Sequence, residues 1–518
     1  MRKIALIIFL FIPTLLCAGT AKPKIFPYIS YPRDYCDPQS FSLNPFPKNN
    51  LHTEITTRFT SSTIPNSELH SSSSLLKSLY SQFSLYSHRP TPFDFELPPY
   101  KSPDNDLRTT YSQALIEISG INLAVWSFDK FILKKNWAQI SIHSIYDNLD
   151  NGFVWDRGTF ISNQLAHPYH GAIYFSAARL NGLNPLESTL FTALGSLMWE
   201  SFFELNYPSI NDTLMTTLGG IILGGPLHQI GNMMRIHHTG GFFGLLQKPM
   251  MVLINPSFGF SLFSDKHPGL SLFSEIHHYS FRLPFGTYWS PNNHQKFMVG
   301  LQIENRDYIE KNLTEINPYD WFLLDFRLGL SQERPWDKEI LTTVMLSGYK
   351  TKSGLSGVFG VYDYIDTQVI DRVSAAGIGF GAISNYHSEP DFFTKTSGVI
   401  SFILGGSTPS SDIEKCHFGQ IDQNPYYFGP GMMSRFRIEV GKKNIGSLLA
   451  KFSHYWINSL FSEAQESLSV SSFNLRLNLT KNSQINLGYD CYIRQGTVSK
   501  KNHAATHGAA KIFYLYNF

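Results

Sequence analysis

The chain has 518 residues, of which 16% are charged and 14% are aromatic, and its formal net charge at pH 7 is +2. This length exceeds what one ordinary hydrophobic core organises, so we expect two or more domains. The nearly balanced charge gives no reason to expect a nucleic-acid partner. The sequence holds no cysteine and histidine spacing typical of zinc sites and no GxSxG motif of serine hydrolases.

The N-terminus has the layout of a secretory signal peptide. In "MRKIALIIFLFIPTLLCAGTAKPK", Arg2 and Lys3 precede an apolar run and then small residues, which predicts a signal peptide over 1–21 with cleavage after Ala21. Lipidation at Cys17 is the alternative, but the bulky Leu16 before it favours simple cleavage. No later apolar run reaches about 18 residues, so no ordinary membrane-spanning helix is expected to follow.

Residues 22–105 are rich in Ser, Pro, Thr and Asn and show no sustained periodicity. We expect an irregular segment that is a spacer or, less favoured, an arm that binds a partner. Beyond the signal the chain keeps three cysteines, Cys36, Cys416 and Cys491. One disulfide among them is compatible with an oxidising compartment, and the sequence does not specify the pair.

Residues 106–240 have the features of helices. The stretch "DLRTTYSQALIEISGINLAVWSFDKFIL" is long, mostly apolar and free of proline. In "NPLESTLFTALGSLMWESFFEL", Asn184 fits an N-cap, with Pro185 at the first and Glu187 at the third helical position. A further helix begins after Pro208 with Ser209 as its cap. Its two glycine pairs, in "LGGIILGG", indicate that another backbone approaches closely, since glycine otherwise costs helix stability.

The hydrophobic period changes to two in residues 250–518. The stretches "FNLRLNLT", "INLGYDCYI" and "FLLDFRLGL" alternate apolar and polar residues, so each strand has one apolar and one polar face. The strands are about ten residues long, and their polar faces carry charged residues and glycine, which suits the wet lumen of a transmembrane barrel. A secreted β-sandwich is the alternative.

The C-terminus favours the barrel. In "AAKIFYLYNF", Tyr514, Tyr516 and Phe518 fall on one face and the last residue is aromatic. This resembles the C-terminal signal of bacterial outer-membrane barrels, which the barrel assembly machinery reads. We therefore predict an α+β chain, with an N-terminal α-helical domain over 106–240 and a C-terminal antiparallel transmembrane β-barrel of about 12 strands over 250–518.

The apolar helical region contains eight polar residues that we single out as candidates: Asn163, His167, Arg179, Ser196, Glu200, Glu204, Ser209 and Asp212. Ser196, Glu200 and Glu204 are four residues apart and line one stripe of a helix. Buried carboxylates without partners are costly, so we expect these to be paired. Arg179 and His167 are the nearest partners by residue type.

Three interpretations of these residues compete. In the favoured one they form a structural network, with Arg179 paired to a glutamate, His167 capping the helix that starts at Pro168, and Asn163, Ser196 and Ser209 as further members. In the second, His167 and a glutamate carry out acid–base chemistry, with His167, Glu200, Glu204 and Asp212 as catalytic candidates. The third, a metal site of His167, Glu200 and Glu204, lacks an HExxH motif, so we expect no metal and no cofactor.

The segments "NQLAHPYHGAIYFSAARLNGLNP", "GSLMWESFFE" and "YPSINDTLMTTLGGIILG" resemble an uncharacterised bacterial envelope family, domain of unknown function 3943, over about residues 130–235. Gly225 departs from the family pattern, in which an acidic residue is expected. The pattern falls on Asn163, His167, Pro168, Gly171, Tyr174, Ala178, Arg179, Ser196, Trp199, Glu200, Glu204, Pro208, Ser209, Asp212, Gly219 and Gly220. The resemblance implies an envelope location and a helical domain paired with a barrel, and it implies no activity.

We therefore expect an outer-membrane β-barrel protein whose helical domain is periplasmic, beneath the barrel or partly plugging it. The expected role is structural or transport-related, with outer-membrane lipid and the assembly machinery as partners, no nucleic acid, and a small-molecule or lipid ligand left open. The alternative is a membrane-associated enzyme that acts on lipid or cell-wall material at His167, Glu200 and Glu204. The enzyme question stays open, leaning towards no activity.

Overall fold

The computed structural model describes residues 107–155, 158–236, 279–290, 295–306, 316–330, 336–367, 370–387, 391–409, 426–460, 464–498 and 501–517. The predicted signal peptide, the segment 22–105, Phe518 and the cysteines other than Cys491 lie outside these residues. The helical elements are α4 (Leu107–Ser127), η2 (Phe128–Ile132), η3 (Asn136–Ala138), α5 (Ile142–Asn151), η4 (Ser162–Ala166), α6 (His167–Leu180), α7 (Pro185–Phe202) and α8 (Ile210–Ile236). Within the described part of the chain, none of these helices is both long and apolar enough to cross a membrane.

The predicted helix starts are confirmed. Asn184 caps α7 by accepting a hydrogen bond from the Glu187 backbone N–H at 2.9 Å, and the Glu187 carboxylate accepts from the Asn184 N–H at 2.8 Å. This reciprocal capping box satisfies two backbone donors of the first turn. Ser209 caps α8, since its hydroxyl accepts a hydrogen bond from the Asp212 N–H at 3.1 Å.

The C-terminal half is a closed barrel of twelve antiparallel strands, as predicted. Each strand pairs with its neighbours in sequence, and β1 pairs with β12 to close the ring. The strands are β1 (Tyr279–Trp289), β2 (Gln295–Arg306), β3 (Trp321–Leu330), β4 (Asp337–Lys350), β5 (Gly354–Thr367), β6 (Asp371–His387), β7 (Phe392–Pro409), β8 (Tyr426–Lys442), β9 (Gly446–Asn458), β10 (Ala464–Thr480), β11 (Ser483–Val498) and β12 (Lys501–Asn517).

The alternation of the sequence decides which side chains face the lumen. On β10, Phe473 and Leu475 are 62% and 38% exposed on the outer wall, while Asn474 and Arg476 between and beside them are buried. A side chain that points inwards is shielded by the rest of the ring, whereas one that points outwards is not. The predicted polar inner face and apolar outer wall are therefore both present in the fold.

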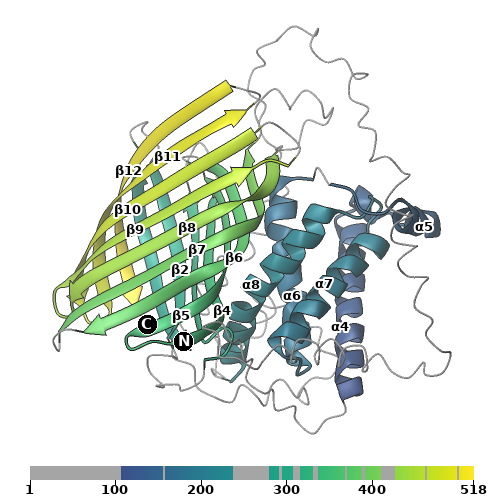
Figure 1. Ribbon diagram of the computed structural model, residues 1–518, viewed down its shortest axis with the longest axis horizontal. Coiled ribbons are helices and arrows are strands. Elements are labelled where there is room, and N and C mark those ends of the chain that lie inside the picture. Colours follow the sequence, from purple (N-terminus) through teal and green to yellow (C-terminus); the bar gives the residue numbers. More distant parts are fainter. Residues whose placement is uncertain are drawn as a thin grey trace, which may run out of the picture. The chain divides into compact units, whose positions relative to one another are not determined.

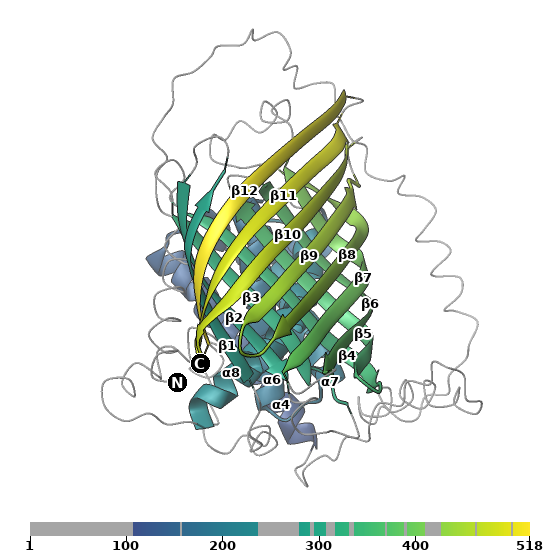
Figure 2. The same cartoon turned by 90° about the vertical axis from the view of Figure 1, so that its left-hand side faces the viewer.

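The helices pack against the outer wall of the barrel. Helix α8 contacts β4 to β7, and Ile222 of α8 joins Val344 and Tyr362 in the largest buried apolar cluster. Tyr362 points outwards, since its neighbour Asp363 faces the lumen, and its hydroxyl donates to the Gln164 carbonyl oxygen at 2.5 Å. Figure 1 shows α8 beside the strands, with α6, α7 and α4 successively farther from them, and Figure 2 shows the helices behind the wall of strands that faces the viewer.

The contacts of the described helices lie on the outside of the barrel, whereas a plug would contact its inner face. These helices contact outward-facing side chains, such as Tyr362 and Asn305, and the lumen contains the strands' own side chains. Many apolar residues of α8 cover the barrel wall.

Two glycine positions explain how closely the helices approach their neighbours. A Cβ atom on Gly220 of α8 would lie 2.5 Å from the Gly171 carbonyl carbon of α6, closer than packed atoms come. A Cβ atom on Gly225 would lie 2.3 Å from the ring of Tyr319, next to β3. The departure from the family pattern at Gly225 therefore has a steric reason, because this face of α8 rests on an aromatic ring.

Candidate functional sites

The helical bundle brings together three of the predicted polar residues. His167 is the first residue of α6, Glu200 lies near the end of α7, and Asp212 lies in the first turn of α8. The His167 ring nitrogens are 4.0 Å (Nδ1) from Glu200 Oε1 and 3.9 Å (Nε2) from Asp212 Oδ2, and all three side chains are buried. One ligand atom from each residue lies within 4.8 Å of the others, which is the size of a metal-binding group.

Neighbouring groups hold the two carboxylates in place. Glu200 Oε2 accepts a hydrogen bond from the Ser209 backbone N–H at 2.8 Å, and Asp212 Oδ1 accepts one from the Asn211 side-chain amide at 3.2 Å. Thr216 Oγ1 lies 3.1 Å from His167 Nδ1. Each carboxylate thus has one oxygen held by a hydrogen bond from a neighbouring residue, and its other oxygen faces His167.

Glu204, which the sequence placed on the same stripe, stands apart from this group. Helix α7 ends at Phe202, so Glu204 no longer follows the helical spacing. Its carboxylate accepts a hydrogen bond from the Trp199 indole at 2.9 Å. Asp212 takes the place in the group that the metal interpretation gave to Glu204.

Two members of the favoured structural network lie far from each other on α6. Arg179 is twelve residues beyond His167, about 18 Å along the helix axis, and its pairing with a glutamate stays a prediction. Its guanidinium donates to the Leu183 carbonyl oxygen. His167 does not cap α6, because the preceding π-helical turn η4 continues directly into that helix and the His167 ring faces α7 and α8.

Asn163 and Ser196 are buried in the same bundle, on η4 and α7. Three residues near the cluster were missed by sequence reasoning: His170, Asn211 and Thr216. His170 follows His167 by three residues, and Thr216 follows Asp212 by four, so both spacings were available as helical signals. Asn211 gave no signal, because its role depends on the turn that leads into α8.

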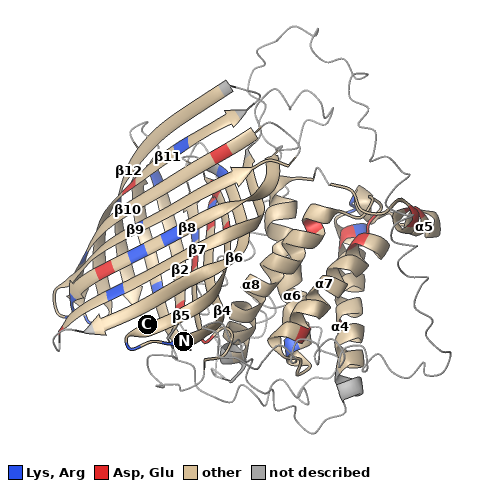
Figure 3. Ribbon diagram, viewed as in Figure 1, with Lys and Arg blue, Asp and Glu red and all other residues tan. Residues whose placement is uncertain are grey.

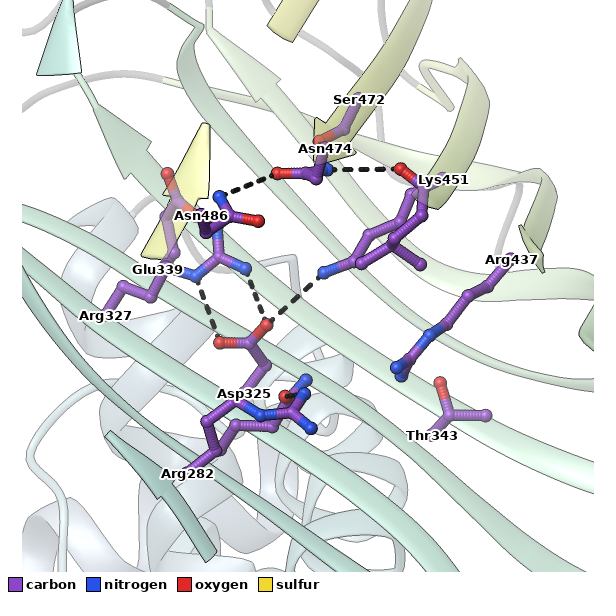
Figure 4. Close-up of polar contacts among 12 residues, drawn as sticks. Arg282, Asp325, Arg327, Glu339, Thr343, Arg437, Lys451, Ser472, Asn474 and Asn486 are labelled. Atoms are coloured by element: carbon purple, nitrogen blue, oxygen red, sulfur yellow. Dashed lines mark hydrogen bonds and ion pairs between the residues drawn. The ribbon is translucent and has the colours of Figure 1, made fainter. Parts of the chain in front are cut away.

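The barrel lumen contains a second polar group (Figure 4). The Arg327 guanidinium on β3 binds Asp325 of the same strand at 2.6 and 3.0 Å and approaches Glu339 of β4 at 3.4 Å. Lys451 of β9 lies 3.9 Å from Asp325. Figure 3 shows charged residues along the strands, whereas most residues of the described helices are uncharged.

Several of these contacts cross the lumen. Strands β9 and β3 are six places apart in the ring of twelve, so Lys451 and Asp325 reach each other from opposite walls. Arg435 of β8 binds Asp363 of β5, and Tyr455 of β9 donates to the same carboxylate at 2.7 Å. A cluster of buried apolar side chains, including Tyr288, Met433 and Tyr455, fills a further part of the interior. Side chains of the described residues therefore bridge the lumen.

Tyr514 and Tyr516 lie on β12 on the outward face, opposite to the buried Phe513 and Leu515. The Tyr514 ring is 5.0 Å from Phe285 of β1, across the seam that closes the barrel. Their role in barrel assembly stays a prediction, and Phe518 lies outside the described residues.

A closed antiparallel barrel with an apolar outer wall and a charged, buried interior has the architecture of outer-membrane β-barrel proteins. Residues 152–257 match the model of the family "Domain of unknown function (DUF3943)", which confirms the resemblance seen in the sequence. The match runs from the end of α5 to beyond α8, so it covers the cluster of His167, Glu200 and Asp212.

Among solved structures, the chain is similar to the NanC porin, at 9% identity over 45% of this chain and 98% of that one, with a TM-score of 0.27. It is also similar to an outer membrane channel from Pseudomonas putida, at 8% identity over 46% and 94%, with a TM-score of 0.23. A third similarity is to the β-domain of the Bordetella autotransporter BrkA, at 9% identity over 47% and 99%, with a TM-score of 0.21. The comparison with curated proteins gave no match.

Proposed function

We propose that the protein is an outer-membrane β-barrel with a blocked lumen, whose outer wall holds the helical bundle with the bundle's exposed apolar faces turned to lipid. Its role is structural, because the barrel fixes the bundle in place instead of conducting solutes. The observation that carries this proposal concerns the inner and the outer face of the barrel wall. Charged side chains bridge the lumen, and α8 covers outward-facing residues that would otherwise contact lipid.

The exposed surfaces of the barrel and of the helical bundle support the proposal that both contact lipid. The barrel wall away from the helices exposes apolar side chains, including Phe436, Ile438, Leu448, Phe473 and Leu487. The bundle does the same on α4 and α7, for which no extensive contact with the described strands is present. Leu186, Leu190, Leu194 and Leu197 form an exposed stripe along α7, and Leu115, Ile116 and Leu123 are exposed on α4. Exposed apolar patches of this kind mark surfaces that contact a membrane or another protein.

The distribution of charged residues along the helices also supports contact of the bundle with lipid. Between Asp212 and Arg235, α8 has no charged residue, and on α7 the two glutamates lie near opposite ends. The helix α5 combines polar residues with the exposed side chains of Ile142, Tyr146 and Leu149. Helices of this type lie in the interface between lipid and water. Helices α7 and α8 thus have uncharged middles, and the buried Glu117 in the middle of α4 accepts a hydrogen bond from Asn181, as charged groups inside membrane proteins are paired.

The orientation follows from the turns. Four of the five connections at the barrel end where β12 finishes have two to four residues, whereas four of the six at the opposite end have five or more, and the shorter turns face the periplasm in such barrels. Helix α8 reaches this end with Gln229, which contacts Tyr319 and Asn305. Its beginning lies near the opposite end, where Met215 approaches Gly405. In the proposed arrangement the cluster of His167, Glu200 and Asp212 is therefore on the outer side.

The blocked lumen predicts low conductance. Purified full-length protein in planar lipid bilayers should show no stable open channel, because the Lys451–Asp325 and Arg435–Asp363 contacts cross the interior. Insertion is checked separately by heat-modifiable migration on a gel. A matched channel-forming porin, reconstituted in the same way, controls for the assay. Steady conductance of porin size from folded, inserted protein would contradict the proposal.

A further inference from the structure

We propose that His167, Glu200 and Asp212 form a binding site for one divalent transition-metal ion. The inference concerns this cluster alone and does not depend on where the bundle lies relative to the membrane. The three residues come from three helices, and their ligand atoms lie within 4.8 Å of one another. Three convergent ligands from separate helices form a site only after the bundle has folded, as in other metal sites of helical bundles.

The distances favour an ion between the ligands over direct contacts. The 4.0 Å separation joins His167 Nδ1 to Glu200, the 3.9 Å separation joins His167 Nε2 to Asp212, and both are too long for hydrogen bonds. Only one of the two ring nitrogens can bind the ion, and with one ligand atom taken from each residue the three atoms lie within 4.8 Å of one another. Metal ions bind nitrogen and oxygen at about 2.0–2.2 Å, so two ligands of one ion lie several ångströms apart. The spacing of the cluster is therefore of the size that a coordinated ion needs after a small contraction.

The surroundings are those of metal ligands. The Ser209 N–H and the Asn211 amide each orient one carboxylate, and the outer hydrogen-bond partners of metal ligands commonly do this. His170, one helical turn beyond His167, packs against the rings of Tyr174 and Trp199 and is not a member of the cluster.

The donor set decides the kind of ion. Two carboxylates and a neutral imidazole carry a charge of −2, which one divalent cation balances. Imidazole suits zinc, iron and similar transition ions, whereas calcium and magnesium prefer oxygen ligands alone. Zn²⁺ and Mn²⁺ are therefore the appropriate probes, with Ca²⁺ as the comparison.

The test is ion binding to purified, tag-free, full-length protein in detergent after treatment with EDTA. We expect one Zn²⁺ or Mn²⁺ per chain and weaker binding of Ca²⁺. Glu200→Gln or Asp212→Asn should weaken Zn²⁺ binding at least about tenfold, as losses at metal sites typically do. Glu204→Gln, which removes a nearby carboxylate outside the cluster, should leave the affinity unchanged. Absence of Zn²⁺ and Mn²⁺ binding, or unchanged affinity in the double variant Glu200→Gln with Asp212→Asn, would overturn the proposal.

A second measurement covers the case in which the variants do not fold. Electron paramagnetic resonance of Mn²⁺ bound to the wild-type protein should show nitrogen coupling from one imidazole. His167→Gln, if it folds, should abolish that coupling, while His143→Gln on the exposed helix α5 should not. Coordination by oxygen alone in the wild-type protein would contradict the site.

Discussion

Replacing Asp363 with alanine should destabilise the barrel by about 3–5 kcal/mol, the usual cost of leaving a buried charge without its partner. Asp363 is fully buried, and its Oδ2 atom binds both the Arg435 guanidinium and the Tyr455 hydroxyl. The substitution leaves the arginine inside the lumen without this carboxylate. The measurement is the urea midpoint of the folded barrel in lipid, followed by heat-modifiable migration and tryptophan fluorescence.

Two variants make this result specific. Asp363→Ala combined with Arg435→Met should recover much of the lost stability, since neither charge is then buried alone. Lys443→Ala removes one charge from the exposed β8–β9 turn and should change stability by no more than about 0.5 kcal/mol. An Asp363→Ala barrel as stable as the wild type would mean that this pair does not bridge the lumen.

Replacing Gly220 with leucine should disrupt the helical bundle while the barrel stays folded. A Cβ atom at this position would meet the Gly171 carbonyl carbon, carbonyl oxygen and Cα at 2.5–2.8 Å, and backbone cannot move aside as a flexible side chain does. Overpacking typically costs 1–3 kcal/mol and occasionally more, so we expect a loss of about 3 kcal/mol in the bundle. Hydrogen exchange of α6 and α8 amides should accelerate, while barrel amides should stay protected.

Gly120 of α4 is the matched control. A Cβ atom there would meet nothing within 4 Å, so Gly120→Leu adds the same side chain without a clash. Because glycine costs about 1 kcal/mol in a helix, this variant should be neutral or slightly stabilising. Equal protection of α6 and α8 in Gly220→Leu and Gly120→Leu would refute the close helix crossing.

The strand pattern and helix caps were predictable because they depend on local sequence. Alternation of Phe473, Leu475 and their polar neighbours specifies which side of a strand is apolar, and the capping box at Asn184 and Glu187 is complete within four residues. The side of the barrel on which the helices pack was not predictable. An apolar face of α8 is compatible with a bundle core, a lumen or an outer wall, and only the paired positions of Tyr362 and Asp363 distinguish them.

The residues of the candidate site were predictable from the sequence, but the contacts between them were not. His167, Glu200 and Asp212 could be recognised as polar residues in apolar helices, but their convergence depends on the packing of three separate helices. Glu204 was grouped with Glu200 because the spacing assumed a longer helix, and α7 ends before it. Arg179 was chosen as a partner by residue type alone, and the length of α6 places it at the opposite end.

The most direct test of the proposed arrangement is the lipid exposure of α7. A spin label at Leu194→Cys, in a full-length chain whose native cysteines are replaced, is reconstituted in lipid and exposed to oxygen and to a water-soluble nickel complex. Leu475→Cys on the barrel wall is the lipid-facing reference, and Lys443→Cys in the exposed β8–β9 turn is the water-exposed one. The Leu194 label should be relaxed by oxygen and protected from nickel, like the label at position 475. Relaxation by nickel like that at position 443 would place the bundle in water and contradict the account.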